Sequence, residues 1–391
     1  MSGGVRMSSI RKTQHLHVHA IRAFSLVELL VAMALGLILL AGMISVFAGN
    51  KRSSDLNSAM ADIQENARFA LDTLAKDIRM AGFQGCVDIN SGPANLLAAT
   101  LPTADFHATA AMGSIVGAGS LWQPSPPLGF VPANHSAIAG THSLTLQFGS
   151  PDTYPLAQQV SVGGVPDATG PIVVDTTPGA NDIDFNLTAG DYALIGNCVI
   201  ADIFRASSVV EGTNTATVGH SAPENNSGAL TQAYNGGPGT DNETKFMRFV
   251  SSVYYVGDTG LTNDDGDPIT ALYQQSLPYG DPVNNPPTEL VRGVENMRIA
   301  FGVRVSAQGL SYVLPDDALY DPKAVESIRI GLLMNSYDRI SQSDDTNTYV
   351  LAGQPIAAKD ASAGNGLDVH EKDQRFRLAF NTTVKIRNRR D

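Results

Sequence analysis

The sequence predicts an α+β protein: a long N-terminal α-helix packed on a large antiparallel β-sheet head domain with long loops. Three observations predict this fold class. Residues 29–48 form an apolar run without any charge, residues 56–78 carry an apolar stripe at helical spacing, and short alternating or β-branched runs follow. The chain is 43% hydrophobic, so the part after Phe83 can bury a core of its own.

The apolar run has the length of a membrane helix. Its residues contain neither charge nor proline, and at about 1.5 Å per residue they span roughly 30 Å, the thickness of a bilayer's hydrocarbon core. Residues 1–23 carry Arg6, Arg11, Lys12 and Arg22 and no acid. By the positive-inside rule, this end stays in the cytoplasm and the rest of the chain lies on the other side.

Glu28 stands at the start of this apolar run. A glutamate within a membrane-length segment is costly unless something pairs with it. It is therefore a candidate functional residue.

The helix pattern continues beyond the membrane segment. Its apolar stripe consists of Leu56, Met60, Ile63, Ala67, Leu71, Leu74 and Ile78. Spacings of three and four residues place these side chains on one helix face, and the opposite face is charged. No proline interrupts residues 24–80, and Gly82 is a suitable C-terminal stop. A helix of about 55 residues would reach roughly 80 Å.

The remainder reads as a β-rich head. Strands are expected at residues 143–148, 172–175, 192–195, 216–218, 246–256, 297–305, 328–334 and 382–387. Two long stretches, residues 91–142 and 221–244, are interpreted as surface loops. The head could be one elaborated domain or two sub-domains.

The N-terminal segment carries a family resemblance. Its residues are Ala23-Phe24-Ser25-Leu26-Val27-Glu28. This segment resembles the class III signal of type IV pilins and pseudopilins. The resemblance implies cleavage between Ala23 and Phe24 by prepilin peptidase, N-methylation of Phe24, and docking of Glu28 on the N-terminal amine of a neighbouring subunit. The family usually has glycine before the cut, and we expect the small Ala23 to fit the peptidase pocket.

Downstream blocks are similar to PilW-type minor pilins. They comprise residues 64–83 followed by Cys86, residues 190–195 and 201–204 around Cys198, residues 289–297, residues 375–377 and residues 382–389. The implied organisation is a leader at 1–23, a transmembrane half-helix at 24–49, an amphipathic half-helix at 50–82 and a β-rich head at 83–391.

The resemblance implies a minor pilin that primes type IV pilus assembly and sits at the filament tip. The implied partners are other minor pilins, the major pilin, a tip adhesin, the prepilin peptidase and the inner-membrane assembly platform. Before assembly the subunit would cross the inner membrane once with its head in the periplasm. Afterwards it would lie at the extracellular pilus tip.

Other interpretations of the same pattern remain open. A minor pseudopilin of a type II secretion system shares the signal and the helix. A secretory signal cut before Gly49, a plain membrane anchor, and a periplasmic enzyme held by such an anchor are further alternatives. The enzyme alternative has no Gly-x-Ser-x-Gly elbow, glycine-rich phosphate loop or His-Glu-x-x-His motif in its favour. No catalytic residue and no cofactor is therefore expected.

Cys86 and Cys198 are the only cysteines. In an oxidising periplasm such a pair is expected to form a disulfide, and two buried thiols are the alternative. In the chain-entropy model, closing this loop stabilises the fold by on the order of 4 to 5 kcal/mol.

No strong metal site is expected. The best calcium candidate comprises Asp264, Asp265 and Asp267 around Gly266, but the spacing does not fit an EF-hand. A solvated hairpin turn is the preferred interpretation. His15, His17 and His19 lie in the leader, and cleavage would discard them.

The charge balance disfavours nucleic acid as a partner. The full chain carries −12, and removal of the four basic leader residues leaves 22 Lys and Arg against 38 acidic residues, a net charge near −16. Phosphate backbones would be repelled on average. The basic tail with Lys385, Arg387, Arg389 and Arg390 is interpreted as the solvated end of a last strand, with a local DNA patch as the alternative.

Overall fold

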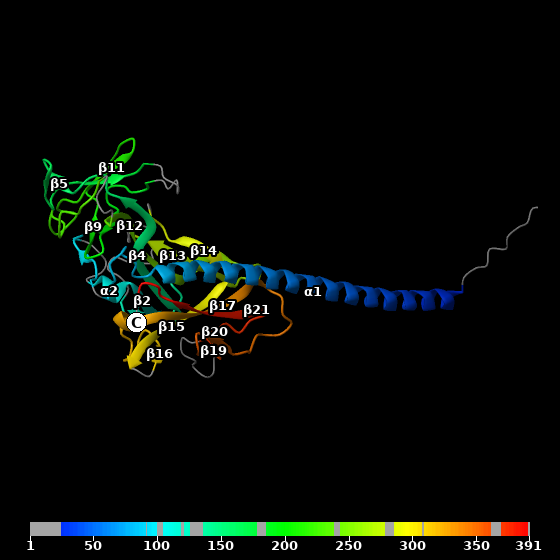
Figure 1. The fold of residues 1–391 in the computed structure, drawn as a ribbon. Coiled ribbons are helices and arrows are strands. Elements are labelled where there is room, and N and C mark those ends of the chain that lie inside the picture. Colours follow the sequence, from blue (N-terminus) through cyan, green and yellow to red (C-terminus); the bar gives the residue numbers. More distant parts are fainter. Residues whose placement is uncertain are drawn as a thin grey trace, which may run out of the picture. The chain divides into compact units, whose positions relative to one another are not determined.

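The computed structural model of the protein is drawn in Figure 1. It describes residues 25–90, 92–99, 105–118, 121–125, 136–177, 185–237, 243–277, 285–306, 309–360 and 369–389. The chain divides into two compact units, Met1–Asp55 and Leu56–Asp391. Each unit is described by itself below.

Helix α1 (Leu26–Met80) begins and ends as local sequence signals predict. At its start, Ser25 Oγ accepts a hydrogen bond from the backbone N–H of Glu28 at 3.1 Å. At its end, Gly82 adopts a φ of 75°, a left-handed conformation that glycine takes without steric cost. Asn388 Nδ2 lies 3.2 Å from the carbonyl oxygen of Met80 and bonds to one of the helix's unpaired carbonyl groups.

The second half of α1 belongs to the head unit and supplies part of its main core. Its buried residues are Ile63, Ala67, Ala70, Leu74, Ala75 and Ile78. The stripe predicted from sequence is thus confirmed from Ile63 onward, whereas Leu56 is 36% exposed. Ala70 and Ala75 were not expected in this face. Their small side chains allow sheet residues to approach the helix closely.

Among the described residues, the strands form five sheets (Figure 1). The largest has nine strands: β1 (Asn95–Leu96), β2 (Ala111–Val116), β3 (Trp122–Gln123), β4 (His142–Pro155), β8 (Tyr192–Gly196), β9 (Ala201–Arg205), β12 (Lys245–Thr262), β13 (Pro268–Ser276) and β14 (Thr288–Arg292). The second has the order β16-β15-β17-β21, with β15 (Val294–Ser306), β16 (Gly309–Val313), β17 (Val325–Arg339) and β21 (Arg375–Lys385).

The smaller elements decorate these two sheets. One three-stranded sheet consists of β7 (Ile172–Asp175), β10 (Ser208–Glu211) and β11 (Thr215–Gly219). Another consists of β18 (Tyr349–Leu351), β19 (Gln354–Ala358) and β20 (Val369–His370). The remaining elements are the pair β5 (Ser161–Val162) and β6 (Val165–Pro166), the short helix α2 (Phe106–Thr109) and the 3₁₀ turn η2 (Pro322–Ala324).

The expected α+β class with a long helix and a predominantly β head is confirmed, but the prediction of one large antiparallel sheet is wrong. The long strand β12 pairs with β8 through residues 245–248 and with β13 from Ser252 onward. The sheet therefore branches along β12 instead of continuing as one layer. In addition, β1 with β9 and β19 with β20 pair in parallel.

The main core lies between α1 and the two largest sheets. It combines Leu144 and Tyr254 of the nine-stranded sheet with Ile299 and Ile330 of the four-stranded sheet, packed against Leu74 and other buried residues of the helix. Burying one such side chain contributes about 1.5 to 3 kcal/mol. The amphipathic half of α1 is therefore an integral part of the head.

Each run predicted as a strand lies in or overlaps a strand of the structure. The interpretation of residues 91–142 as a surface loop is wrong for the described part of that stretch. It contains β1, α2, β2 and β3, and β2 pairs with β4 inside the nine-stranded sheet. Its sequence, Ala-Met-Gly-Ser-Ile-Val, lacks polar alternation because both of its faces are largely buried.

Candidate assembly site

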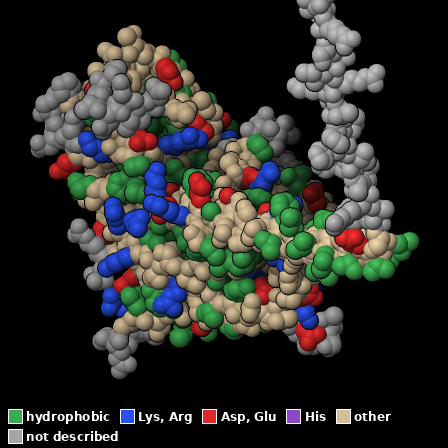
Figure 2. Space-filling model, turned by 90° about the vertical axis from the view of Figure 1, so that its right-hand side faces the viewer, with side chains coloured by type: hydrophobic (Ala, Val, Ile, Leu, Met, Phe, Trp, Pro, Cys, Tyr) green, Lys and Arg blue, Asp and Glu red, His purple; other side chains and the backbone are tan. Residues whose placement is uncertain are grey.

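The first half of α1 presents an unusually apolar surface. Fifteen large hydrophobic side chains between Leu26 and Phe47 are exposed, and one 18-residue window has the length and composition to cross a membrane. Figure 2 shows this part of the helix covered by hydrophobic side chains, whereas the head surface mixes charged and polar groups. Leaving so many large apolar side chains in water costs on the order of 20 to 40 kcal/mol. This segment is therefore suited to an apolar environment such as a bilayer.

Glu28 lies in the first turn of α1 and is exposed. With Ser25 three residues earlier, it completes the Ser-x-x-Glu pattern of a helix capping box. Sequence reasoning considered Glu28 only as a docking residue and did not recognise this pattern. A carboxylate at this position also interacts favourably with the helix dipole. The carboxylate thus lies where the helix dipole favours it, and the role in docking stays a prediction. The predicted cleavage and methylation residues, Ala23 and Phe24, lie outside the described residues.

Asp77 joins the end of α1 to the nine-stranded sheet. Its Oδ2 accepts a hydrogen bond from the hydroxyl of Tyr254 on β12, and that hydroxyl accepts one from Gln274 Nε2 at 2.9 Å. Burial raises the pKa of Asp77 above its ordinary value, an effect that the Tyr254 bond only partly offsets. Burial, with the charge of Asp77, likewise raises the pKa of Tyr254. The contact anchors the helix through a carboxyl group whose ionised form is disfavoured.

We expect Asp77→Asn to retain the Tyr254 bond and to stabilise the protein at pH 7 by less than about 1 kcal/mol, because the carboxyl is partly exposed and screened. In the native protein, the raised pKa means that protonated Asp77 is favoured by folding. Its contribution to the free energy of unfolding is fully present below the ordinary pKa of 3.8, and it is lost as the pH rises through the raised pKa. Urea denaturation at pH 3.5 and pH 7 measures this. A loss above about 1 kcal/mol for Asp77→Asn at pH 7 would show instead that the ionised carboxylate stabilises the junction.

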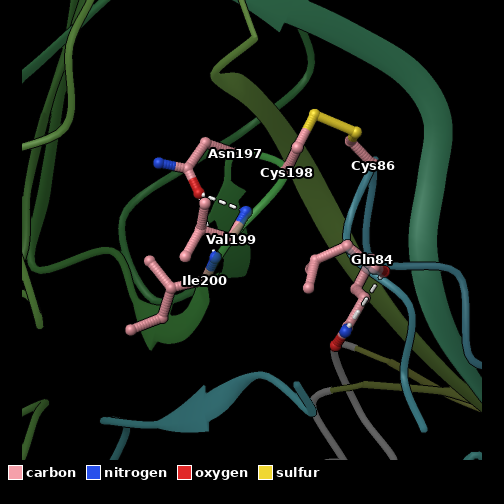
Figure 3. Close-up of a disulfide and its surroundings, with 7 residues drawn as sticks. Gln84, Cys86, Asn197, Cys198, Val199 and Ile200 are labelled. Carbon is pink, nitrogen blue, oxygen red and sulfur yellow. Dashed lines mark hydrogen bonds between the residues drawn. A yellow bond between two sulfur atoms is a disulfide. The ribbon is translucent and has the colours of Figure 1, made fainter. Parts of the chain in front are cut away.

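Cys86 and Cys198 form the expected disulfide, which Figure 3 shows with its surroundings. Cys86 follows the end of α1, and Cys198 lies in the turn between β8 and β9. Both cysteines are exposed, so the alternative of two buried thiols is wrong. The bond ties the segment after the helix to the nine-stranded sheet.

Side-chain hydrogen bonds hold both ends of the disulfide in place (Figure 3). Asn197 Oδ1 accepts from the backbone N–H groups of Val199 at 2.8 Å and Ile200 at 2.9 Å. On the other side, the buried side chain of Gln84 donates to the Gly92 carbonyl at 2.7 Å and accepts from the Ala94 N–H at 2.8 Å. The two turns are thus shaped by their own sequences as well as by the covalent bond.

The calcium candidate is a hairpin turn between β12 and β13, as preferred from sequence. Asn263 Oδ1 accepts from the backbone N–H of Asp267 at 2.7 Å. The guanidinium of Arg339 binds both carboxylate oxygens of Asp267, at 2.6 and 2.9 Å. Asp264 and Asp265 are exposed. No group of three His, Cys, Asp or Glu side chains suited to a metal ion occurs within the described ranges.

Sequence reasoning missed a buried ionic cluster around Arg377 of β21. The Arg377 side chain is fully buried and contacts three carboxylates: Glu295 at 2.6 Å, Asp373 at 2.8 Å and Asp345 at 3.5 Å. Burial alone would raise the pKa of Asp373, but the hydrogen bond and charge of Arg377 outweigh it and lower that pKa. Asp345 and Glu295 lie far from Arg377 in the sequence, so no local pattern links them to it.

The basic tail is not a uniformly solvated strand end. Arg389 is only 3% exposed. It donates to the backbone carbonyls of Pro322, Val325 at 3.2 Å and His107 at 2.7 Å. Burial lowers the pKa of Arg389 to about 10, so it stays charged at neutral pH. Lys385 and Arg387 are exposed as expected, and Arg390 lies outside the described residues.

The two main features of the chain are thus the exposed apolar first half of α1 and a β-rich head unit that contains the second half of this helix. Comparison with protein families agrees: the prokaryotic N-terminal methylation motif matches residues 19–44. The family described as type IV pilus-assembly protein W matches residues 253–388, from within β12 to the end of the head. The chain is thus similar to type IV pilus-assembly protein W over about a third of its length, and it carries the N-terminal methylation motif. No curated protein and no solved structure matches it.

Proposed function

We propose that this chain is a minor pilin, that it primes pilus assembly and that it occupies the filament tip. The observation that carries the proposal is the exposed apolar half of α1 with a single carboxylate, Glu28, in its first turn. Processing between Ala23 and Phe24 would remove residues 1–23 and place a new amine four residues before that carboxylate. The transmembrane half-helix would then comprise residues 24–49, the amphipathic half-helix 50–82 and the head 83–391.

The mechanism is associative. The apolar half-helix holds the subunit in the inner membrane with its head in the periplasm, and the same surface packs against neighbouring pilin helices when the filament forms. Glu28 pairs with the amine of a neighbour. Burying the two charges together fixes the axial register, because leaving either one unpaired in an apolar contact is expensive. The head then contacts other minor pilins, the major pilin and a tip adhesin. The assembly platform moves the subunit from the inner membrane into the filament.

Three substitutions separate the proposed docking charge of Glu28 from the capping of the helix start. Glu28→Gln keeps a side chain that can complete the capping box but removes the charge. We expect it to lower surface pili by about tenfold or more, as Glu28→Ala does, because the neighbour's amine is left unpaired. Ser25→Ala removes the Oγ acceptor and keeps the charge, so it should assemble nearly normally. Counting pili by electron microscopy measures all three. Normal piliation with Glu28→Gln would contradict the charge-pairing role.

The tip position follows from the size of the head, since residues 83–391 would obstruct close helical packing all along a shaft. Immunogold labelling with an antibody to the head tests it. Label at filament ends supports the proposal, and label at regular intervals along the shaft contradicts it.

A minor pseudopilin of type II secretion is the second candidate, because the methylation motif at 19–44 is common to both classes. The match to type IV pilus-assembly protein W favours the pilus. Deleting the gene should abolish twitching motility and spare protein secretion. The opposite result would assign the chain to secretion.

A further inference from the structure

A basic groove lies where the C-terminal turn of α1 meets strand β21. It has a volume of about 510 Å³ and is lined by Arg79 of the helix and by residues 383–387 and Arg389 of the tail. None of the lining residues is acidic, although the chain carries a net charge of −12. Arg79, Lys385 and Arg387 are exposed. The groove therefore concentrates positive charge on an otherwise acidic protein.

Arg389 supplies a fixed cation to this groove. Its two terminal nitrogens are held by backbone carbonyls, and the residue is 97% buried, since 3% of it is exposed. Its Nε is buried and has no hydrogen-bond partner among the described residues. A buried donor without a partner costs about 1 to 3 kcal/mol.

One wall of the groove is a strand edge. In the described part of the chain, β21 pairs only with β17 and is the last strand of its sheet. The Ile386 N–H donates to Glu326 toward β17, whereas the Arg387 N–H donates to Arg79 on the other side. Because main-chain groups alternate in an antiparallel pair, those of Thr383 point away from β17 toward the groove. Such an edge accepts an added strand.

We propose that this groove binds an extended acidic segment of a partner protein. The segment adds as a short strand along the Thr383 edge, and its carboxylates pair with the basic side chains of the groove. Lys385 ends β21 and Arg387 lies two residues further on; both are exposed while Ile386 between them is buried, so the alternation of a strand continues to Arg387. An acidic residue at every second position of the partner segment matches it. The site lies on the head and does not depend on where the subunit sits in a filament.

The structure favours an acidic peptide over the two other polyanions. Duplex DNA needs many phosphate contacts over a broad surface, and the acidic remainder of the head repels it. An anionic lipid surface presents negatively charged headgroups but no extended main chain that could pair with a strand edge. Only a peptide uses the main-chain groups of the strand edge.

The test uses the full chain in detergent micelles and a fluorescent eight-residue peptide of alternating Glu and Thr. We expect binding that the Gln-for-Glu peptide does not show. Lys385→Glu combined with Arg387→Glu should weaken binding by about tenfold or more, while Lys372→Glu, the same change at an exposed lysine outside the groove, should not. Thr383→Pro removes the edge N–H donor, which an edge strand tolerates, and should weaken binding several-fold. Thr383→Val keeps the donor and should bind normally.

Two results would overturn the proposal. One is equal binding of the Glu and Gln peptides, or no binding of either. The other is binding of duplex DNA or phosphatidylglycerol vesicles that exceeds peptide binding, is lost with the charge reversal and is unaffected by Thr383→Pro. Circular dichroism of each variant confirms folding. Pilus counts for the same variants report separately on the proposed function, so the two proposals fail independently.

Discussion

Replacing Arg377 with methionine is expected to lower the free energy of unfolding by about 3 to 5 kcal/mol. The Arg377 side chain is fully buried, and Glu295 and Asp373 lie within 2.8 Å of its guanidinium. Methionine fills a similar volume but leaves Glu295 without its cation, and Asp373 then keeps only its ion pair with Arg375. Urea denaturation of the full chain in detergent, followed by tryptophan fluorescence and circular dichroism, measures the loss.

Arg387→Met is the matched control, because Arg387 follows β21 but is exposed. It should cost less than about 0.5 kcal/mol. The pH dependence adds a second check. Burial would raise the pKa of Asp373, but Arg377 lowers it below its ordinary value. The stabilisation by ionised Asp373 is therefore present above the ordinary pKa of 3.8 and is lost as the pH falls through the lowered value. An Arg377→Met loss below about 1 kcal/mol at pH 7 would contradict the structural role of the cluster.

Replacing Cys86 and Cys198 together with serine is expected to destabilise the head by about 4 kcal/mol. The disulfide closes a loop with a sequence separation of 112, and the chain-entropy model gives roughly 4.7 kcal/mol for a loop of about that length. Both cysteine residues are exposed, so serine can replace them without leaving a buried cavity. The difference in the free energy of unfolding between the native chain and the double variant should therefore come from the greater entropy of the unfolded variant more than from lost packing.

Reduction of the native protein provides the control for this effect. Unfolding in the presence of a reducing agent should lower the stability of the native chain to that of the double variant, and the variant itself should not respond to the agent. A native protein whose stability is unchanged by full reduction would contradict the expected contribution. Separate counting of free thiols establishes that reduction is complete.

The elements that sequence predicted best depend on local signals. Helix α1 could be traced from its apolar spacing to its stop at Gly82, because periodicity and a glycine with positive φ are properties of neighbouring residues. The disulfide followed from the two cysteines alone. Strand β7, expected at residues 172–175, was also located accurately.

The features that sequence missed depend on contacts between distant residues. Strand β2 lacks alternation because both of its faces are largely buried, so no period of two marks it. The cluster around Arg377 joins Glu295, Asp345 and Asp373 from separate parts of the chain. In the sequence, Arg389 is one of several basic residues near the C-terminus. In the fold, its guanidinium donates hydrogen bonds to the carbonyl oxygens of residues 107, 322 and 325. Tertiary structure alone decides whether such charges face solvent.

The mature N-terminus tests the central claim most directly, because the pilin interpretation requires a free amine close to Glu28. Intact-mass and peptide mass spectrometry of protein taken from membranes of the native host measures it. We expect a chain that begins with N-methylated Phe24. A chain that begins at Gly49, or one that retains residues 1–23, would contradict the account of helix docking and filament assembly.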